Sequence, residues 1–176
     1  MPDASYKNLL TYQYAVYVYD LNKEFLELFL RGAENMRQRQ QMDQAARSSK
    51  QCLCEGATQR TSMKNYIKMI GISRGSYEEL LEDYKDIARN RGIAVWDTAG
   101  LRRNRGLRVF IKDGQPTLPS PHLPPDLAEA VNIMIDLITR TGFLFDRQRQ
   151  SLEEKFLREG GYTENLFRKR TESRRT

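Results

Sequence analysis

The chain has 176 residues, of which 39% are hydrophobic and 30% are charged, and it carries a formal net charge of +6. This length suffices for one domain whose core needs no disulfide or metal to hold it together. No apolar run approaches the roughly 18 residues of a membrane-spanning helix, and the N-terminus lacks the pattern of a signal peptide. We therefore expect a cytoplasmic, charge-rich helical protein.

Residue types that support metal or nucleophilic chemistry are scarce. His122 is the only histidine, and the two cysteines are Cys52 and Cys54. On a helix these cysteines point about 200° apart, so they cannot bridge each other or share a metal there. A zinc site or a histidine-based triad is therefore nearly excluded, and we expect no cofactor, no metal and no enzymatic activity.

The first predicted helix covers about residues 5–31. Its apolar stripe advances in steps of three and four residues and consists of Leu10, Tyr14, Tyr17, Leu21, Phe25 and Leu28. Tyr12, Val16, Tyr19 and Phe29 widen the apolar surface beyond this stripe. A helix this apolar around its circumference is covered on more than one side, so it is either central to a bundle or shared with a neighbouring subunit.

A polar turn over residues 32–41 is expected before a second helix, which runs to about Thr58. The seam of this helix consists mostly of small side chains: Met42, Ala45, Ala46, Ser49, Cys52, Leu53, Gly56 and Ala57. Small residues allow two helix backbones to approach closely, so we predict tight packing against a partner helix. A ligand groove is the less favoured alternative, because no polar cluster accompanies the seam.

A third helix can be capped by Thr61 or Ser62, whose side chains accept hydrogen bonds from first-turn amides. Its seam alternates three- and four-residue steps through Met63, Tyr66, Ile70, Ser73, Tyr77, Leu80, Tyr84 and Ile87. Gly71 and Gly75 each cost about 1 kcal/mol relative to alanine in a helix interior. Because the register holds through both glycines, we predict a continuous helix with a close backbone contact there, and a break as the alternative.

The charges of this third helix run against the helix macrodipole. Lys64, Lys68 and Arg74 lie in the first half, and the second half holds Glu78, Glu79, Glu82, Asp83 and Asp86. The dipole favours the opposite order by about 0.3–1 kcal/mol for each terminal charge. Complementary charges on an adjacent helix or subunit would offset this penalty. Surface charge without a partner is the alternative interpretation.

A long connection over residues 93–125 contains five of the six prolines and several arginines. Its first residues, Ile93–Trp96, form an apolar patch that we expect to fold back onto the end of the bundle. Residues Leu107–Ile111 can form a short extended piece before a turn at Lys112-Asp113-Gly114. The length of this connection makes it a candidate functional loop.

A fourth helix is predicted after Asp126, which can cap it together with Glu129 in capping-box spacing. Gly160-Gly161 is a strong stop signal for its C-terminal end. The chain then continues as a short basic tail, in which Leu166 and Phe167 are candidate anchors of an amphipathic turn.

These elements predict an all-α fold: an antiparallel up-down-up-down four-helix bundle with a long Pro- and Arg-containing loop between the third and fourth helices. Residues 1–160 are expected to form one bundle domain, with the loop inserted at about 93–125. Residues 161–176 are expected to form the basic C-terminal tail.

Basic residues gather in three stretches, which are the second helix with the start of the third, the long loop, and the tail. Three clusters on one chain favour a polyanionic partner over plain solvated surfaces. Lysine and arginine side chains neutralise phosphates and release counterions on binding. The predicted nucleic-acid-binding residues come from the first two stretches: Arg37, Arg39, Arg47, Lys50, Arg60, Lys64, Lys68, Arg102, Arg103, Arg105 and Arg108.

Three segments of the chain resemble a known protein family. They are Ala45–Gln51, the pair Glu55-Gly56, and Gly75–Tyr84 with the order Gly-Ser-Tyr-Glu-Glu-Leu-Leu-Glu-Asp-Tyr. This combination is similar to the signature of bacterial four-helix-bundle proteins encoded within intervening sequences of 23S ribosomal RNA genes. The same fold is shared by the accessory variability proteins of diversity-generating retroelements.

The resemblance covers roughly residues 6–92 and 126–156. It departs from the short family members in the connection at 93–125 and in the longer, basic C-terminus. The resemblance implies a homopentameric ring with a basic surface. For the retroelement members it also implies a reverse transcriptase partner and binding of RNA or DNA.

The leading hypothesis is a non-enzymatic, homo-oligomeric nucleic-acid-binding accessory protein, with a reverse transcriptase as the partner that the resemblance implies. The alternative is a structural protein-interaction scaffold ring without direct nucleic-acid binding, with Trp96 and Phe110 at the interface. An enzyme is the third hypothesis, since Glu78, Glu82 and Asp86 share a helix face and could line a metal site.

Overall fold

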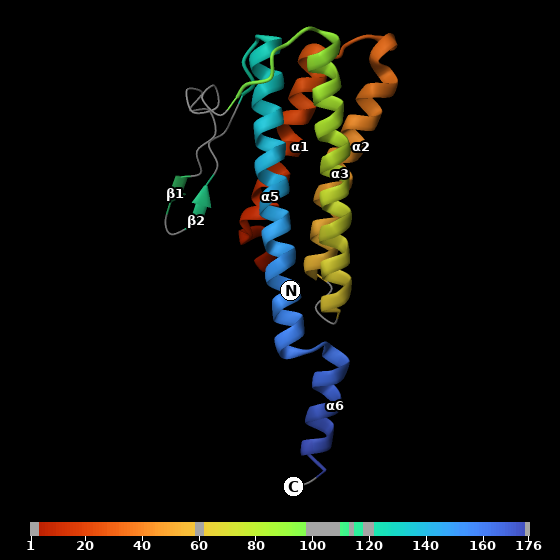
Figure 1. The fold of residues 1–176 in the computed structure, drawn as a ribbon, viewed down its shortest axis with the longest axis vertical. Coiled ribbons are helices and arrows are strands. Elements are labelled where there is room, and N and C mark those ends of the chain that lie inside the picture. Colours follow the sequence, from red (N-terminus) through yellow and green to blue (C-terminus); the bar gives the residue numbers. More distant parts are fainter. Residues whose placement is uncertain (1–3, 59–61, 98–109, 113–114, 118–121, 175–176) are drawn as a thin grey trace.

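The structure, a computed structural model, describes residues 4–58, 62–97, 110–112, 115–117 and 122–174 (Figure 1). In chain order its elements are the short 3-10 helix η1 (Ala4–Asn8), α1 (Leu10–Phe29), the 3-10 turn η2 (Ala33–Asn35), α2 (Met36–Thr58), α3 (Met63–Asn90), the strands β1 (Phe110–Lys112) and β2 (Gln115–Thr117), α5 (Leu127–Glu159) and α6 (Tyr162–Glu172).

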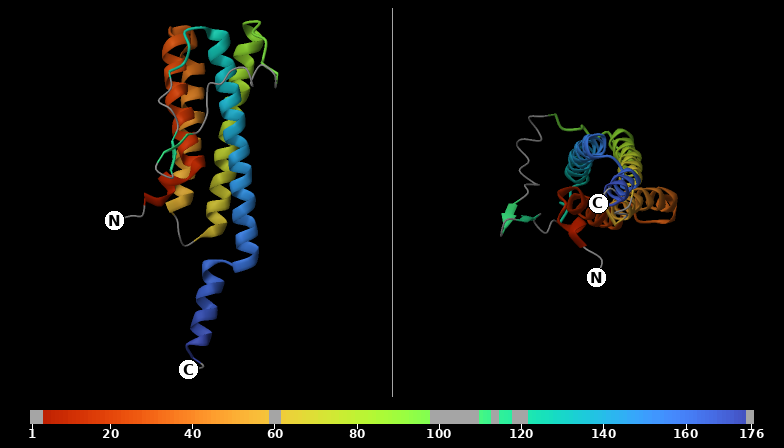
Figure 2. Two further views of the ribbon diagram at one scale, coloured as in Figure 1. Left: turned by 90° about the vertical axis from the view of Figure 1, so that its left-hand side faces the viewer. Right: turned by 90° about the horizontal axis from the view of Figure 1, so that it is seen from below.

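Helices α1, α2, α3 and α5 form the predicted four-helix bundle. Each helix packs against the next in sequence, and α5 closes the bundle by packing against α1 (Figures 1 and 2). The end-on view in Figure 2 shows the four helices around one centre. The largest fully buried side chains come from all four of them: Leu21, Phe25, Met42, Leu53, Ile70, Tyr77, Leu80, Tyr84, Met134, Leu137, Ile138 and Phe145.

The connection between α1 and α2 is shorter than predicted. The chain turns at Gly32, whose φ of 110° lies in the region that favours glycine, and α2 already begins at Met36. The predicted turn over residues 32–41 is therefore wrong in its second half. The reason is that the arginines and glutamines after Met36 are good helix formers despite their polarity, and most of them face solvent.

The small-residue seam of α2 packs tightly against α3, as predicted. Ser49 Oγ donates a hydrogen bond to the Ser73 carbonyl oxygen at 3.0 Å, and Ser73 Oγ donates to the Ser49 carbonyl oxygen at 2.9 Å. A Cβ atom at Gly56 would lie 2.7 Å from the Tyr66 ring and 2.9 Å from the Met69 Cβ. The two backbones thus approach closely at both levels of the interface.

Helix α3 is continuous through Gly71 and Gly75, as predicted, but the close backbone contact expected at these glycines is wrong. A Cβ atom at either position would meet nothing within 4 Å. The reason is that Ile70, Ser73 and Tyr77 are the residues that point into the bundle, so the two glycines lie off the seam. The close approach instead involves the glycine at the end of α2.

Three predicted helix boundaries follow from local hydrogen bonds. Of the two candidate caps of α3, Ser62 is the one whose Oγ accepts from the Asn65 amide, at 3.1 Å. The Asp126 carboxylate caps α5 by accepting from the Glu129 amide at 2.8 Å. Helix α5 ends before Gly160, which has a φ of 73°.

The C-terminal segment is a helix, α6, of 11 residues rather than a frayed tail with an amphipathic turn or two. Leu166 and Phe167 do not anchor it, because they are 52% and 71% exposed. The physical reason is visible in Figure 1, where α5 runs past the end of the other helices and α6 projects away from the bundle. Among the described residues, no bundle helix lies alongside α6.

The connection after α3 begins with a segment held by α5. The side-chain amide of buried Asn132 donates to the Ala94 carbonyl oxygen at 3.0 Å, and its Oδ1 accepts from the Trp96 amide at 2.7 Å. Ile93 packs against the core, whereas Val95 is exposed. Strands β1 and β2 form an antiparallel pair with Lys112 opposite Gln115. Strand β1 overlaps the predicted extended piece at Phe110 and Ile111, Lys112 lies in the strand rather than in the predicted turn, and residues 107–109 and 113–114 lie outside the described residues.

Replacing Asn132 by alanine is expected to release the Ala94–Trp96 segment, at a cost of about 1–2 kcal/mol for the lost hydrogen bonds. Trp96 is the only tryptophan, so its fluorescence emission should shift to longer wavelength. The control is Asn90→Ala, at an exposed position at the end of α3. Unchanged emission in the Asn132→Ala protein would show that the Asn132 hydrogen bonds do not hold the Ala94–Trp96 segment.

Candidate nucleic-acid interface

The predicted nucleic-acid-binding residues divide into two sets. Arg60, Arg102, Arg103, Arg105 and Arg108 lie outside the described residues. The other six lie on two helices, with Arg37, Arg39, Arg47 and Lys50 on α2 and Lys64 and Lys68 on α3.

Arg39 and Lys50 are engaged in the contact between α1 and α2. Arg39 Nη1 donates to the carbonyl oxygens of Leu26 and Leu30, at 3.1 and 3.2 Å, at the C-terminal end of α1, where the Leu26 carbonyl also accepts from the Leu30 amide. The Nζ atom of Lys50 lies 3.7 Å from the centre of the Tyr19 ring, in a cation–π contact. Both side chains therefore have a structural role that the sequence pattern did not indicate.

Lys64 and Lys68 lie one turn apart at the start of α3, and both are exposed. Over the part of the chain that the structure describes, neither side chain has an ion-pair partner. They flank Tyr66 on α3. The hydroxyl of Tyr66 accepts a hydrogen bond of 2.6 Å from Gln148 Nε2, which fixes the level at which α5 passes this end of α3.

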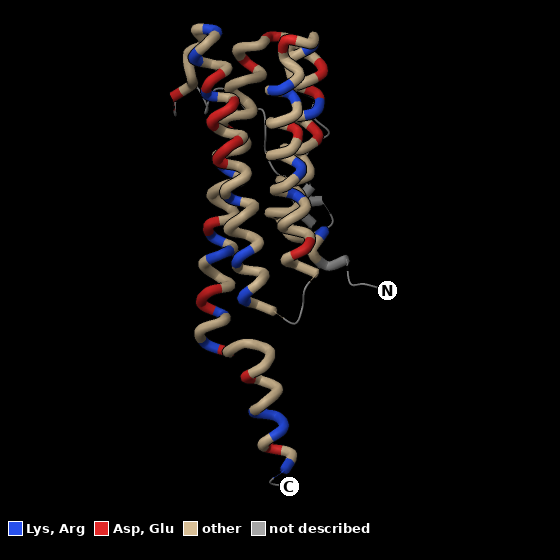
Figure 3. Tube along the Cα trace, turned by 90° about the vertical axis from the view of Figure 1, so that its right-hand side faces the viewer, with Lys and Arg blue, Asp and Glu red and all other residues tan. Residues whose placement is uncertain are grey.

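Two further arginines lie at this level because they flank Gln148 on α5. Arg147 and Arg149 are both exposed, and Arg149 has Glu153 at 3.7 Å. We name the set Lys64, Lys68, Arg147 and Arg149 the lower basic surface. Figure 3 shows Lys and Arg toward this end of α3, with Asp and Glu on the other half of α3, whereas both charge signs alternate along the adjacent part of α5.

The two arginines of α5 were not among the predicted site residues. The signal that could have found them is the run Arg-Gln-Arg-Gln at 147–150, which repeats the run at 37–40. A single residue between two arginines places them on different sides of a helix, so what Arg147 and Arg149 share with the lysines is a level of the bundle, which the pattern alone could not show.

Arg74 is basic and close to the lower basic surface, but it is not available to a ligand. Its Nε atom lies 3.2 Å from Asp146 Oδ2, and its Nη1 lies 2.5 Å from Glu78 Oε2. Gly142 makes room for it, since a Cβ there would lie 3.2 Å from the guanidinium carbon. Arg74 therefore links α3 to α5.

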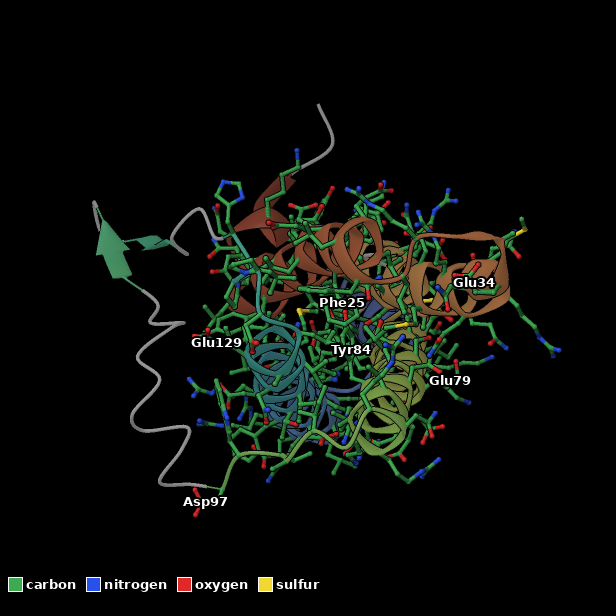
Figure 4. The ribbon with its side chains drawn as sticks, turned by 90° about the horizontal axis from the view of Figure 1, so that it is seen from above. Phe25, Glu34, Glu79, Tyr84, Asp97 and Glu129 are labelled. Atoms are coloured by element: carbon green, nitrogen blue, oxygen red, sulfur yellow. The ribbon has the colours of Figure 1, made fainter. Side chains whose placement is uncertain are left out.

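A groove that contains acidic side chains lies toward the other end of the α2–α3 pair. We name it the α2–α3 groove; it has a volume of about 850 Å³ and is lined by Arg37, Gln40, Gln41, Gln44, Ala45, Ser48, Ser76, Glu79 and Asp83. Figure 4 shows Glu79 on the outer side of α3, whereas Phe25 and Tyr84 point into the bundle. Arg37 thus lies beside carboxylates, while Arg47 is exposed further along α2.

The carboxyl group of Asp83 in this groove has a raised pKa. Partial burial raises the pKa of its carboxyl group, and the neighbouring Asp86 and Glu79 carboxylates raise that pKa further. Neither Asp83 nor Glu79 forms an ion pair among the described residues. The groove therefore repels phosphate and attracts cations.

The acidic residues of α3 that were considered as metal ligands form ion pairs with basic residues of the same helix. Glu78 pairs with Arg74, Glu82 with Lys85 at 2.6 Å, and Asp86 with Arg89 at 2.8 Å. Within the described ranges, no group of three His, Cys, Asp or Glu residues could hold a metal ion. Among the same residues, no helix is both long and apolar enough to cross a membrane.

The fold and the charge distribution define an all-α four-helix protein in which α3 carries basic residues in its first half and acidic residues in its second half. Comparisons with protein-family models, with curated protein sequences and with solved structures gave no match for this chain. The resemblance to the intervening-sequence and accessory variability proteins therefore stays a hypothesis.

Proposed function

We propose that this chain is a non-enzymatic nucleic-acid-binding accessory protein that assembles with copies of itself. The observation that supports this function best is the lower basic surface. There two helices place four exposed cations at one end of the bundle, and the acidic residues of α3 lie at the other end.

The mode of binding that this surface favours is contact with the phosphate backbone. Lysines such as Lys64 and Lys68 act as point charges toward phosphates, and arginines bind phosphate oxygens with two parallel donors. Neutralised phosphates release counterions, so affinity falls as salt concentration rises. Such contacts position the protein on a nucleic acid without reading its sequence.

Changing Lys64 and Lys68 together to glutamine is expected to weaken binding to RNA and DNA. The slope of log affinity against log salt should become less steep by about two, one for each lost phosphate contact. Fluorescence anisotropy with a labelled single-stranded RNA and a labelled DNA duplex, over a series of salt concentrations, measures both quantities.

The matched control is Lys85→Gln with Arg89→Gln, which removes the same charge from exposed positions at the other end of α3. This control should bind nucleic acid as the unchanged protein does. Equal losses in both variants, or binding that ignores ionic strength, would contradict the proposed surface.

The alternative is a scaffold ring that binds a partner protein without binding nucleic acid directly. The observation that favours it is apolar surface on the outside of the bundle, such as Phe143, which is 63% exposed. Oligomerisation without any binding of RNA or DNA would support the scaffold.

The reverse transcriptase partner implied by the resemblance is tested by the genomic neighbourhood. The gene of a reverse transcriptase and a template repeat should lie near the gene of this chain.

A further inference from the structure

Among the described residues, the C-terminal arm, which we define as residues 150–174, stands out because little of the chain packs against it. In Figures 1 and 2 the end of α5 and all of α6 project beyond the bundle. Leu157 is 84% exposed and Phe167 is 71% exposed. An isolated helix of 11 residues is marginal in water, so α6 needs a partner surface.

One face of α6 combines apolar and basic side chains. Tyr162, Leu166 and Lys169 follow one another at steps of four and three residues, and Arg170 lies four residues after Leu166. Within the described residues, neither Lys169 nor Arg170 has an ion-pair partner. Arg168, in contrast, donates to the Glu159 carbonyl oxygen and to Asn165 Oδ1.

The α2–α3 groove is complementary to this face. Its carboxylates Glu79 and Asp83 lack an ion-pair partner over the described ranges, and Arg37 is the only cation of its lining. Its lining on α2 extends from Arg37 to Ser48, about 16 Å at 1.5 Å per residue, which matches the length of α6. The aliphatic stems of its glutamines offer apolar surface between the charges.

We propose that α6 of one copy docks in the α2–α3 groove of a second copy, with Lys169 and Arg170 facing Glu79 and Asp83. The proposal rests on the self-association in the proposed function and names the surfaces that would mediate it. The contact joins two different surfaces, so repetition gives a closed ring or an open chain of copies.

The groove of the same chain is out of reach of its own α6. Phe145 of α5 stacks on Tyr77 of α3, with ring centres 5.1 Å apart, so the two residues lie at one level of the bundle. Gly160 lies roughly 22 Å further along α5, whereas α6 is about 16 Å long. Even folded straight back, α6 would end about 6 Å short of the level of Tyr77.

Charge reversal on either side of the contact tests the docking. We expect the unchanged protein to associate, and expect the mass of Glu79→Lys with Asp83→Lys, and of Lys169→Glu with Arg170→Glu, to fall to the 20.6 kDa of one chain. Combining all four changes in one chain should restore the original mass, and mixing the two variants should restore association. Light scattering coupled to size-exclusion chromatography measures each mass.

The matched control is Glu82→Lys with Asp86→Lys, which makes the same change of charge on α3 outside the groove lining and should keep the original mass. Restoration by the combined variant rules out misfolding as the cause of the loss. If the unchanged protein associates and both reversed variants keep its mass, the docking is wrong and self-association still stands.

A protein that is monomeric at all concentrations would overturn both the docking and the self-associating part of the proposed function. Binding of RNA is scored separately, with the Lys64→Gln, Lys68→Gln protein as reference. If the Lys169→Glu, Arg170→Glu protein loses RNA affinity without a change of mass, the arm binds nucleic acid and the docking is overturned.

Discussion

Replacing Asn22 by leucine should lower the free energy of unfolding by about 2–4 kcal/mol. The reason is that each buried polar group left without a hydrogen-bond partner costs about 1–3 kcal/mol. Asn22 lies on α1 with its side chain buried in the bundle. Its Oδ1 accepts a hydrogen bond of 2.9 Å from the Tyr84 hydroxyl, and its Nδ2 donates to the Met42 carbonyl oxygen at 3.3 Å. This one side chain thus connects α1 with α2 and α3.

The Tyr84 hydroxyl carries most of this cost. It is fully buried, and burial raises its pKa well above the ordinary value, so ionisation cannot relieve the loss of its acceptor. The Met42 carbonyl lies within α2 and keeps a helical donor. Urea denaturation followed by circular dichroism measures the change, with the slope expected to stay constant.

A double-mutant cycle supplies the control for this prediction. Tyr84→Phe alone leaves Asn22 Oδ1 without its donor, whereas Asn22→Leu combined with Tyr84→Phe removes both members of the hydrogen bond. The combined loss should therefore be smaller than the sum of the single losses. Strictly additive losses would show that the two side chains do not interact in solution.

Replacing Gly56 by alanine should lower stability by about 1–3 kcal/mol, the usual cost of overpacking a tight interface. The new methyl group would lie 2.9 Å from the Met69 Cβ, which is attached directly to the α3 backbone. Rotation of a flexible side chain cannot relieve that contact, so the two helices must separate. Separation would also stretch the reciprocal Ser49 and Ser73 hydrogen bonds.

Gly75→Ala is the matched control, and its expected effect has the opposite sign. No atom lies within 4 Å of a Cβ at this position, so alanine should stabilise α3 by about 1 kcal/mol through its higher helix propensity. Thermal unfolding of both variants gives the comparison. A decrease of stability in both, or in neither, would mean that α2 and α3 pack differently from the structure described.

Local sequence patterns were enough to predict much of the fold. The four bundle helices, the cap at Asp126 and the stop at Gly160 depend on residues within a few positions of one another. The seam of α3 from Ile70 to Ile87 was also predictable, since all of its members are buried on one face. Such features need only helical periodicity and capping chemistry, which act within one turn or two.

The candidate site was less predictable, because it depends on which side chains meet across helices. Arg39 and Lys50 have the same charge pattern as their neighbours, yet contacts with α1 engage them. Arg147 comes to the level of Lys64 and Lys68 only because α5 passes α3 at the Tyr66–Gln148 hydrogen bond. Charge clusters along the sequence and charge clusters in space are therefore different sets.

The amino-acid sequence by itself determined that this chain is helical, where α3 and α5 are capped, where α5 stops, and most of the stripe that each bundle helix buries, with Leu28 of α1 as an exposed exception. Only the tertiary structure decided which glycine makes the close contact, which cations remain free and where α6 projects. The reason is geometric: periodicity and caps are properties of one helix, whereas these outcomes depend on the axial level at which antiparallel helices pass each other. That level follows from packing of the whole bundle around Phe25, Tyr77 and Tyr84.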